Sequence, residues 1–176
     1  MKIYTRTGDG GETSLFNGVR VSKADMLIDL LGDSDELNAH LGVVYDLLDN
    51  QHSQEQIRQI IDQLFKLNAA IVKSPRYLNL DLTVVVSQLE LWIDEMDATL
   101  PALTNFIYQF GHLAVSQIHV ARTISRRVER KLVAIAGIEP IDSSFIRYMN
   151  RLSDYLFILA RYVAKLFGVE EKIIIS

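Results

Sequence analysis

Apolar residues recur at steps of three and four between residues 22 and 168, which is the spacing of one buried face of an α-helix. Pro75, Pro101 and Gly137 interrupt this pattern and act as helix stop signals. The sequence therefore predicts five helices of roughly 18 to 30 residues joined by short loops, and short loops favour antiparallel neighbours. The expected fold is all-α, a mostly antiparallel five-helix bundle. The predicted helices span about residues 22–48, 53–74, 82–100, 105–136 and 142–168.

Two of the helix starts are predicted from capping boxes. Ser22 with Asp25, and Ser53 with Gln56, place a hydroxyl three residues before a side chain that can reach back to the cap. Residues 82–86 also fit a short strand, but their neighbours offer no strand to pair with, so we expect a helix there.

The length and composition indicate one globular domain. The chain has 176 residues, of which 49% are hydrophobic and only 3 are proline, so intrinsic disorder is excluded. It contains no cysteine, which excludes disulfides, thiolate metal sites and a cysteine nucleophile. We expect a single helical domain over residues 1–176, with a loop at 1–21, the bundle at 22–168 and a short tail at 169–176.

The charge and hydropathy narrow the expected partners. The net charge is −4, so we expect no nucleic-acid partner. No apolar run approaches the ~20 residues that span a bilayer, and the N-terminus lacks the apolar core of a signal peptide. We expect no membrane insertion and a cytoplasmic location. The mean hydropathy of +0.14 is high for a soluble chain, which favours an oligomer interface.

The first 21 residues are rich in glycine and hydroxyl groups. Glycines let a backbone approach a ligand closely, and threonine hydroxyls donate to phosphate oxygens. Arg20 and Lys23 add positive charge just before the first predicted helix. The segment therefore fits either a phosphate-binding loop or a flexible N-terminal arm. It is not a P-loop, because it lacks the Gly-Lys-Ser/Thr sequence.

A basic segment lies in the fourth predicted helix. Residues 122–131 hold five positive side chains and one negative one in an otherwise acidic protein. Arg122, Arg126, Glu129 and Arg130 share a broad helix face. This face fits polyphosphate binding, since guanidinium groups match phosphate oxygens. It fits equally well a solvated surface with internal Arg–Glu pairs.

Two further polar clusters lie on predicted helices. Asn150, Ser153, Asp154 and Phe157 fall on neighbouring turns of the last helix, where polar groups serve either a site or hydrogen bonds between helices. An acidic cluster in the first helix can meet an arginine of the fourth or form a solvated face. The members of that acidic cluster are Asp33, Asp35, Glu36 and Asn38.

The four histidines do not predict a metal site. A di-iron site in a bundle needs Glu-x-x-His pairs, and the sequence contains none. We expect all four to be structural or exposed. His112 follows Gly111 at the start of the fourth helix, where a functional role is the alternative.

Five motifs in order resemble the PduO-type ATP:corrinoid adenosyltransferases. They are Thr-Arg-Thr-Gly-Asp-x-Gly-x-Thr-Ser-Leu-Phe at 5–16, Arg-Val-Ser-Lys at 20–23, Asp-Glu-Leu-Asn at 35–38, Arg-x3-Arg-Arg-x-Glu-Arg at 122–130 and Asn-Arg-Leu-Ser-Asp-Tyr-Leu-Phe at 150–157. The resemblance covers nearly the whole chain. It implies a homotrimeric five-helix bundle with each active site between two subunits. The implied reaction moves the 5′-deoxyadenosyl group of ATP to the cobalt of reduced cobalamin and releases triphosphate.

The resemblance also implies roles for individual residues. Lys23 and Arg126 would neutralise the triphosphate, while Glu129 and Asn150 would position the nucleotide, with Mg²⁺ held chiefly by phosphate oxygens. The N-terminal loop would bind the triphosphate through Thr5, Arg6, Thr7, Gly8, Asp9, Gly11 and Thr13.

On the corrin side, the resemblance implies that Asp35 pairs with Arg122 at the subunit contact. Phe106 would crowd the lower face of the corrin and displace its lower cobalt ligand, and Phe157 would line the same pocket. No protein metal site is implied. A reductase and a B12-dependent acceptor enzyme are the implied protein partners.

Residues 108–112 depart from the family pattern, which has Leu-Pro-Gly-Gly after the Phe-Ile pair. This departure motivates an alternative, a homologue that binds ATP as a nucleotide- or corrin-binding module but has weak or lost adenosylation.

Overall fold

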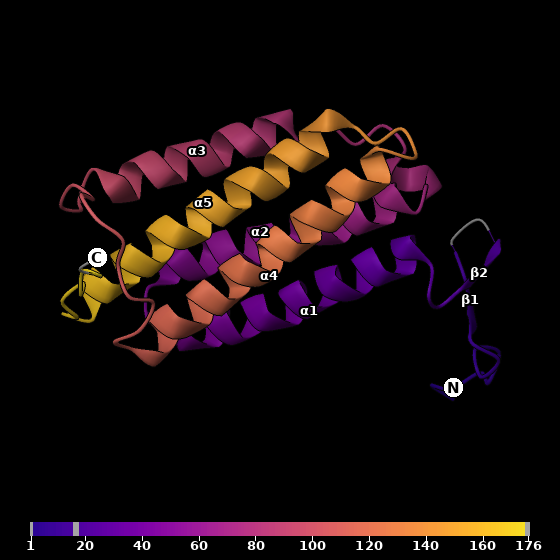
Figure 1. The fold of residues 1–176 in the computed structure, drawn as a ribbon, viewed down its shortest axis with the longest axis horizontal. Coiled ribbons are helices and arrows are strands. Elements are labelled where there is room, and N and C mark those ends of the chain that lie inside the picture. Colours follow the sequence, from indigo (N-terminus) through magenta and orange to yellow (C-terminus); the bar gives the residue numbers. More distant parts are fainter. Residues whose placement is uncertain (1, 16–17, 175–176) are drawn as a thin grey trace.

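The computed structural model describes residues 2–15 and 18–174, and within them the five predicted helices form one elongated bundle (Figure 1). The predicted all-α bundle is therefore confirmed. No helix among these residues is long and apolar enough to cross a membrane. The helices are α1 (Met26–Leu47), α2 (Gln51–Ile71), α3 (Thr83–Asp97), α4 (Leu113–Ala136) and α5 (Ser143–Leu166), with a 3-10 turn, η1 (Pro75–Tyr77).

Helix α4 lies between α1 and α5, and α3 packs on the other side of α5. The buried face of α4 repeats at alternating steps of four and three, which keeps one stripe against its neighbours. Its members are Ala114, Ile118, Ala121, Ser125, Val128, Leu132 and Ile135. The basic side chains of residues 122–131 lie outside this stripe, so the core stripe determines which way the arginines point.

The N-terminal segment contains a small antiparallel hairpin rather than only a loop. Strands β1 (Glu12–Ser14) and β2 (Arg20–Ser22) pair with Thr13 opposite Val21. The guanidinium of Arg20 donates to the carbonyl of Thr7 at 2.9 Å and lies 3.3 Å from Glu12. Arg20 thereby ties the preceding loop to the hairpin, which projects beyond the N-terminal end of α1 (Figure 1).

Both predicted capping boxes are wrong. The backbone of Ser22 is extended because it pairs with Glu12 in the hairpin, and Asp25 caps α1 by accepting from the Leu27 amide at 2.8 Å. Asn50 caps α2 by accepting from the Ser53 amide at 2.9 Å. Both α1 and α2 therefore begin at a side chain that accepts from an amide of the first turn.

The fourth helix begins eight residues later than its predicted start at about residue 105, because residues 106–108 pair with the C-terminal tail. The amide of Tyr108 donates to the Lys172 carbonyl at 2.9 Å, which makes this backbone extended. Gly111 has φ 131°, and a Cβ there would lie 2.6 Å from Val169 Cγ1, so the turn requires glycine. His112 then caps α4 through Nδ1, which accepts from the Ala114 amide.

Two buried tyrosines on α5 make a matched test of the core. Tyr155 donates to Gln56 Oε1 at 2.9 Å, whereas the Tyr148 hydroxyl has no hydrogen-bond partner within residues 2–15 and 18–174. We expect Tyr155→Phe to lower the free energy of unfolding by about 1–2 kcal/mol, because it leaves a buried amide oxygen unpaired. Tyr148→Phe should leave that free energy unchanged or raise it. Urea unfolding measures both, and equal losses would contradict the assignment.

Candidate functional site

The first part of the candidate site lies where α4 faces α5. Asn150 donates from Nδ2 to Glu129 Oε1 at 3.0 Å, which joins the motif of the fourth helix to that of the fifth. Arg126 lies one turn before Glu129 and is exposed. No ion pair or hydrogen bond from Arg126 is present among the described residues. Three residues predicted to contact the nucleotide therefore share one surface. The guanidinium of Arg126 on this surface is free to bind an anion.

A second cluster lies nearer the N-terminal end of α4. The guanidinium of Arg122 lies over the ring of Phe157 at 6.0 Å, and its Nε donates to Nδ1 of His119 at 3.4 Å. Burial, together with the charge of Arg126, lowers the pKa of Arg122 from its usual value. The structure therefore places the predicted residues Arg122 and Phe157 in direct contact.

The imidazole of His119 is neutral at physiological pH. His119 is only 3% exposed, and burial together with the charge of Arg122 lowers its pKa from 6.5 to about 4. A neutral ring keeps the Nδ1 lone pair that accepts from Arg122. His119 is thus a buried histidine that accepts a hydrogen bond from an arginine of the site.

This lowered pKa predicts an acid-sensitive fold. His119 binds a proton near pH 6.5 in the unfolded chain but only near pH 4 in the folded protein. The free energy of unfolding therefore falls as the pH drops from 6.5 to 4. Between pH 7 and 5 the expected loss from this residue is about 2 kcal/mol. His119→Asn, which keeps an acceptor, should flatten that slope in urea titrations at the two pH values. The same change at exposed His52 is the control, and a His119→Asn variant with the wild-type slope would contradict the prediction.

Within the chain, the acidic residues Asp33 and Glu36 of α1 meet Arg127 and Lys131 of α4. Arg127 donates to Asp33 at 2.9 Å and also bonds Glu36, and Lys131 lies 2.7 Å from Asp33. Burial alone would raise the pKa of Asp33, but hydrogen bonds from Lys131 and Arg127 outweigh it and lower this pKa. Asp35 is exposed, and it forms no ion pair with Arg122 within the described chain. The intrachain contact between α1 and α4 therefore uses Arg127.

The third part of the site is the loop before β1. A Cβ at Gly8 would lie 3.2 Å from Nζ of Lys23, so the lysine ammonium sits against the glycine backbone. The hydroxyls of Thr5 and Thr7 are 2.9 Å apart. The structure thus gathers two threonines, a glycine and a lysine at the hairpin, and Arg6 and Asp9 are exposed beside them. Gly11 has φ 83°, and Thr13 lies in β1.

Phe106 lies at the other end of the bundle, on the segment that precedes α4. Its side chain is 85% exposed. Figure 1 shows this segment and the C-terminus at the end of the bundle opposite the hairpin. Within one protomer, the hairpin and Phe106 are therefore separated by most of the bundle's length. The 24 residues of α4 alone extend about 36 Å.

Two features of the site region were not predicted from the sequence: the contact of His119 with Arg122, and the burial of Arg161. Arg161 is 3% exposed although it is charged. The available signal was its position, because Arg161 directly follows Ala160 in the apolar stripe of the fifth helix. A charged residue at such a position requires buried partners.

Comparisons with known proteins agree with these features. A family model described as "Cobalamin adenosyltransferase" matches residues 3–163. The chain is 37% identical to the corrinoid adenosyltransferase MMAB of Homo sapiens, over 98% of this chain and 72% of that protein. It is 40% identical to the corrinoid adenosyltransferase PduO of Salmonella typhimurium, over 92% of this chain and 49% of that protein.

A solved structure shares the fold. It is that of a variant PduO-type ATP:corrinoid adenosyltransferase from Lactobacillus reuteri, complexed with cobalamin and ATP. The TM-score is 0.94 at 30% identity, covering 99% of this chain and 100% of the other. The chain therefore belongs to the cobalamin adenosyltransferase family, which confirms the resemblance found in its motifs.

Proposed function

We propose that this protein transfers the 5′-deoxyadenosyl group of ATP to the cobalt of reduced cobalamin. In this reaction cobalt(I) attacks C5′ of the nucleotide, a cobalt–carbon bond forms, the C5′–O bond breaks, and triphosphate leaves with the electron pair. One observation carries the proposal. The match to proteins named corrinoid adenosyltransferases runs through both the N-terminal hairpin and the Arg126–Glu129–Asn150 surface.

The reaction requires the protein to orient the nucleotide and to stabilise negative charge, and it does not require a general base. Because cobalt(I) is itself the nucleophile, no side chain has to take a proton. Lys23 and Arg126 would stabilise the negative charge of the leaving triphosphate, and Glu129 with Asn150 would orient the nucleoside. Mg²⁺ prefers phosphate oxygens, water and a few carboxylates, and Glu129 supplies a carboxylate on this surface.

The site we propose lies between two subunits of a homotrimer. The hairpin projects away from its own bundle, so its loop is available to a neighbouring protomer (Figure 1). Arg126 is exposed on α4 and would receive the phosphates that this loop holds. Asp35, exposed and outside the Arg127 cluster, would pair with Arg122 of the partner subunit. Phe106 and Phe157 would line the corrin side.

A single assay tests the reaction. Purified protein is mixed with ATP, Mg²⁺ and chemically reduced cobalamin, and the absorbance of adenosylcobalamin is followed together with triphosphate release. Equal amounts of the two products are expected. ATP binding in calorimetry without either product would overturn the proposal in favour of a nucleotide-binding module.

Light scattering tests the shared site, and a monomeric mass would contradict it. A reductase that supplies cobalt(I) and an enzyme that accepts the product are the expected partners.

A further inference from the structure

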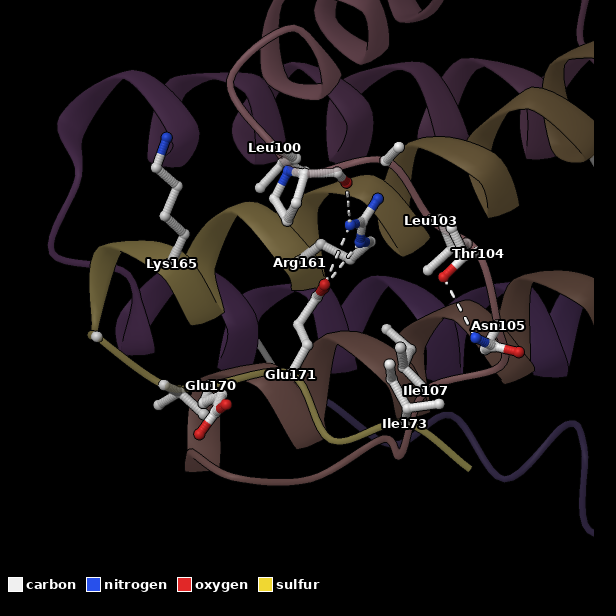
Figure 2. A pocket seen from close by; sticks show the side chains of 14 residues that line it. Leu100, Leu103, Thr104, Asn105, Ile107, Arg161, Lys165, Glu170, Glu171 and Ile173 are labelled. Carbon is white, nitrogen blue, oxygen red and sulfur yellow. Dashed lines mark hydrogen bonds and ion pairs between the residues drawn. The ribbon is translucent and has the colours of Figure 1, made fainter. Parts of the chain in front are cut away.

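Arg161 is a buried cation that joins three parts of the chain at one end of the bundle. Its side chain on α5 is 2% exposed. Nε and Nη2 donate to the two carboxylate oxygens of Glu171 at 2.7 and 3.0 Å, and Nη2 also donates to the carbonyl of Pro101 at 2.8 Å. Figure 2 shows this guanidinium between the loop that follows α3 and the C-terminal tail. Asp97 lies 3.7 Å from Nη1.

The tail held by Arg161 is the segment that pairs with the backbone around Phe106. The Ile174 amide donates to the Phe106 carbonyl at 2.8 Å, and the Tyr108 amide donates to the Lys172 carbonyl at 2.9 Å. Ile107 and Ile173 form the antiparallel bridge between these bonds. Glu171 therefore lies immediately before the ladder, and the Arg161–Glu171 pair holds the tail to α5 at this point.

Most of the segment around Phe106 is exposed, and Ile107 beside it is half-buried. The ring of Phe106 is 85% exposed, so its own contacts do not hold it. A pocket of about 510 Å³ separates the loop from the tail, and Leu103, Ile107, Arg161 and Ile173 line it (Figure 2). Across this pocket, the guanidinium bonds both walls at once. The position of Phe106 thus depends on a few polar contacts rather than on a filled core.

We propose that Arg161 and Glu171 are positioning residues for Phe106, and that they act on the corrin half of the reaction alone. This inference rests on the proposed function and on the role that the family resemblance implies for Phe106, which is to displace the lower ligand of cobalt. Displacement needs a ring held at a fixed distance from the metal. A tail that detaches leaves the ring free to swing away, so reduction of cobalt(II) slows while ATP binding is untouched.

The primary variant is Glu171→Gln, which keeps the size of the side chain and removes the charge that pairs with Arg161. We expect the rate that starts from cobalt(II)alamin and a mild reductant to fall about tenfold, and the KM for ATP to stay within about twofold. Arg161→Lys keeps the charge but loses the two-pronged bond, so it should show an intermediate loss. Glu170→Gln is the matched control, since Glu170 is the exposed neighbour of the same charge.

Two readouts separate a positioning role from a merely structural one. In hydrogen exchange, the Tyr108 and Ile174 amides should exchange faster in Glu171→Gln, while the amides of α4 keep wild-type protection. In a double-mutant cycle, Glu171→Gln should add less than about twofold to the loss caused by Phe106→Ala, because both act through one ring.

The outcomes distinguish this inference from the proposed function. If Phe106→Ala slows the reaction and Glu171→Gln does not, or if the two losses multiply, the positioning role is overturned. If the wild type forms no adenosylcobalamin, the proposed function fails instead, and exchange of the Tyr108 amide still reports whether the ion pair holds the ladder. A rise in the KM for ATP of Glu171→Gln as large as its loss of rate would also contradict the inference.

Discussion

Replacing Arg126 by alanine is expected to lower kcat/KM for ATP by about 100- to 1000-fold, a loss of the size seen when one preorganised donor to a developing negative charge is removed. The physical reason is that triphosphate carries its charge away as the C5′–O bond breaks, and the guanidinium would stabilise that charge. Arg126 is exposed and bonds no other described residue, so its removal should not change the fold. Steady-state kinetics at varied ATP and at saturating reduced cobalamin measure the effect.

Two further variants sharpen this result. Arg126→Lys keeps the charge but not the planar fork, so we expect it to recover only part of the loss. Arg58→Ala removes an exposed arginine from α2, where it pairs with Glu55 and Asp62, and should leave ATP kinetics unchanged. The oligomeric mass and the melting temperature should match the wild type in all three variants. Normal ATP kinetics in Arg126→Ala would remove this residue from the phosphate site.

The helices could be predicted from sequence because their signal is local. A buried stripe at steps of three and four, such as that of α4, is visible in any window of two turns. The helix starts were not predictable in the same way. Ser22 has the right chemistry for a cap, but its backbone pairs with a strand ten residues earlier. The extended conformation of residues 106–108 depends on a tail more than 60 residues away.

The site shows the same division between local and distant information. That Arg126 and Glu129 share a face follows from helix geometry, and the Glu129–Asn150 bond joins two motifs that the sequence had singled out. Which arginine meets the acidic residues of α1 does not follow. Residues 122 and 127 point about 140° apart on a helix, and only the packing of α4 on α1 decides that Arg127 reaches Asp33.

Replacing Phe106 by alanine should slow the reduction of cobalt(II) strongly and the adenosyl transfer from cobalt(I) only slightly. Starting from cobalt(II)alamin and a mild reductant, we expect the rate to fall about 100-fold, equivalent to a potential shift of about 120 mV for one electron. Starting from cobalamin already reduced to cobalt(I), the loss should stay below about fivefold, because the lower ligand no longer has to be displaced before reduction. The KM for ATP should not change.

Because Phe106 is exposed, its replacement should change the reaction without changing the stability of the fold. Its ring is 85% exposed, so truncation leaves no cavity in the core and the melting temperature should be that of the wild type. Phe110→Ala is the matched control, since Phe110 is half-exposed on the same segment and packs against Tyr108 with ring centroids 5.0 Å apart. We expect the control to keep both rates within about twofold. Equal losses from the two oxidation states would mean that Phe106 contributes binding alone, and that the protein does not act on the lower face of the corrin through this ring.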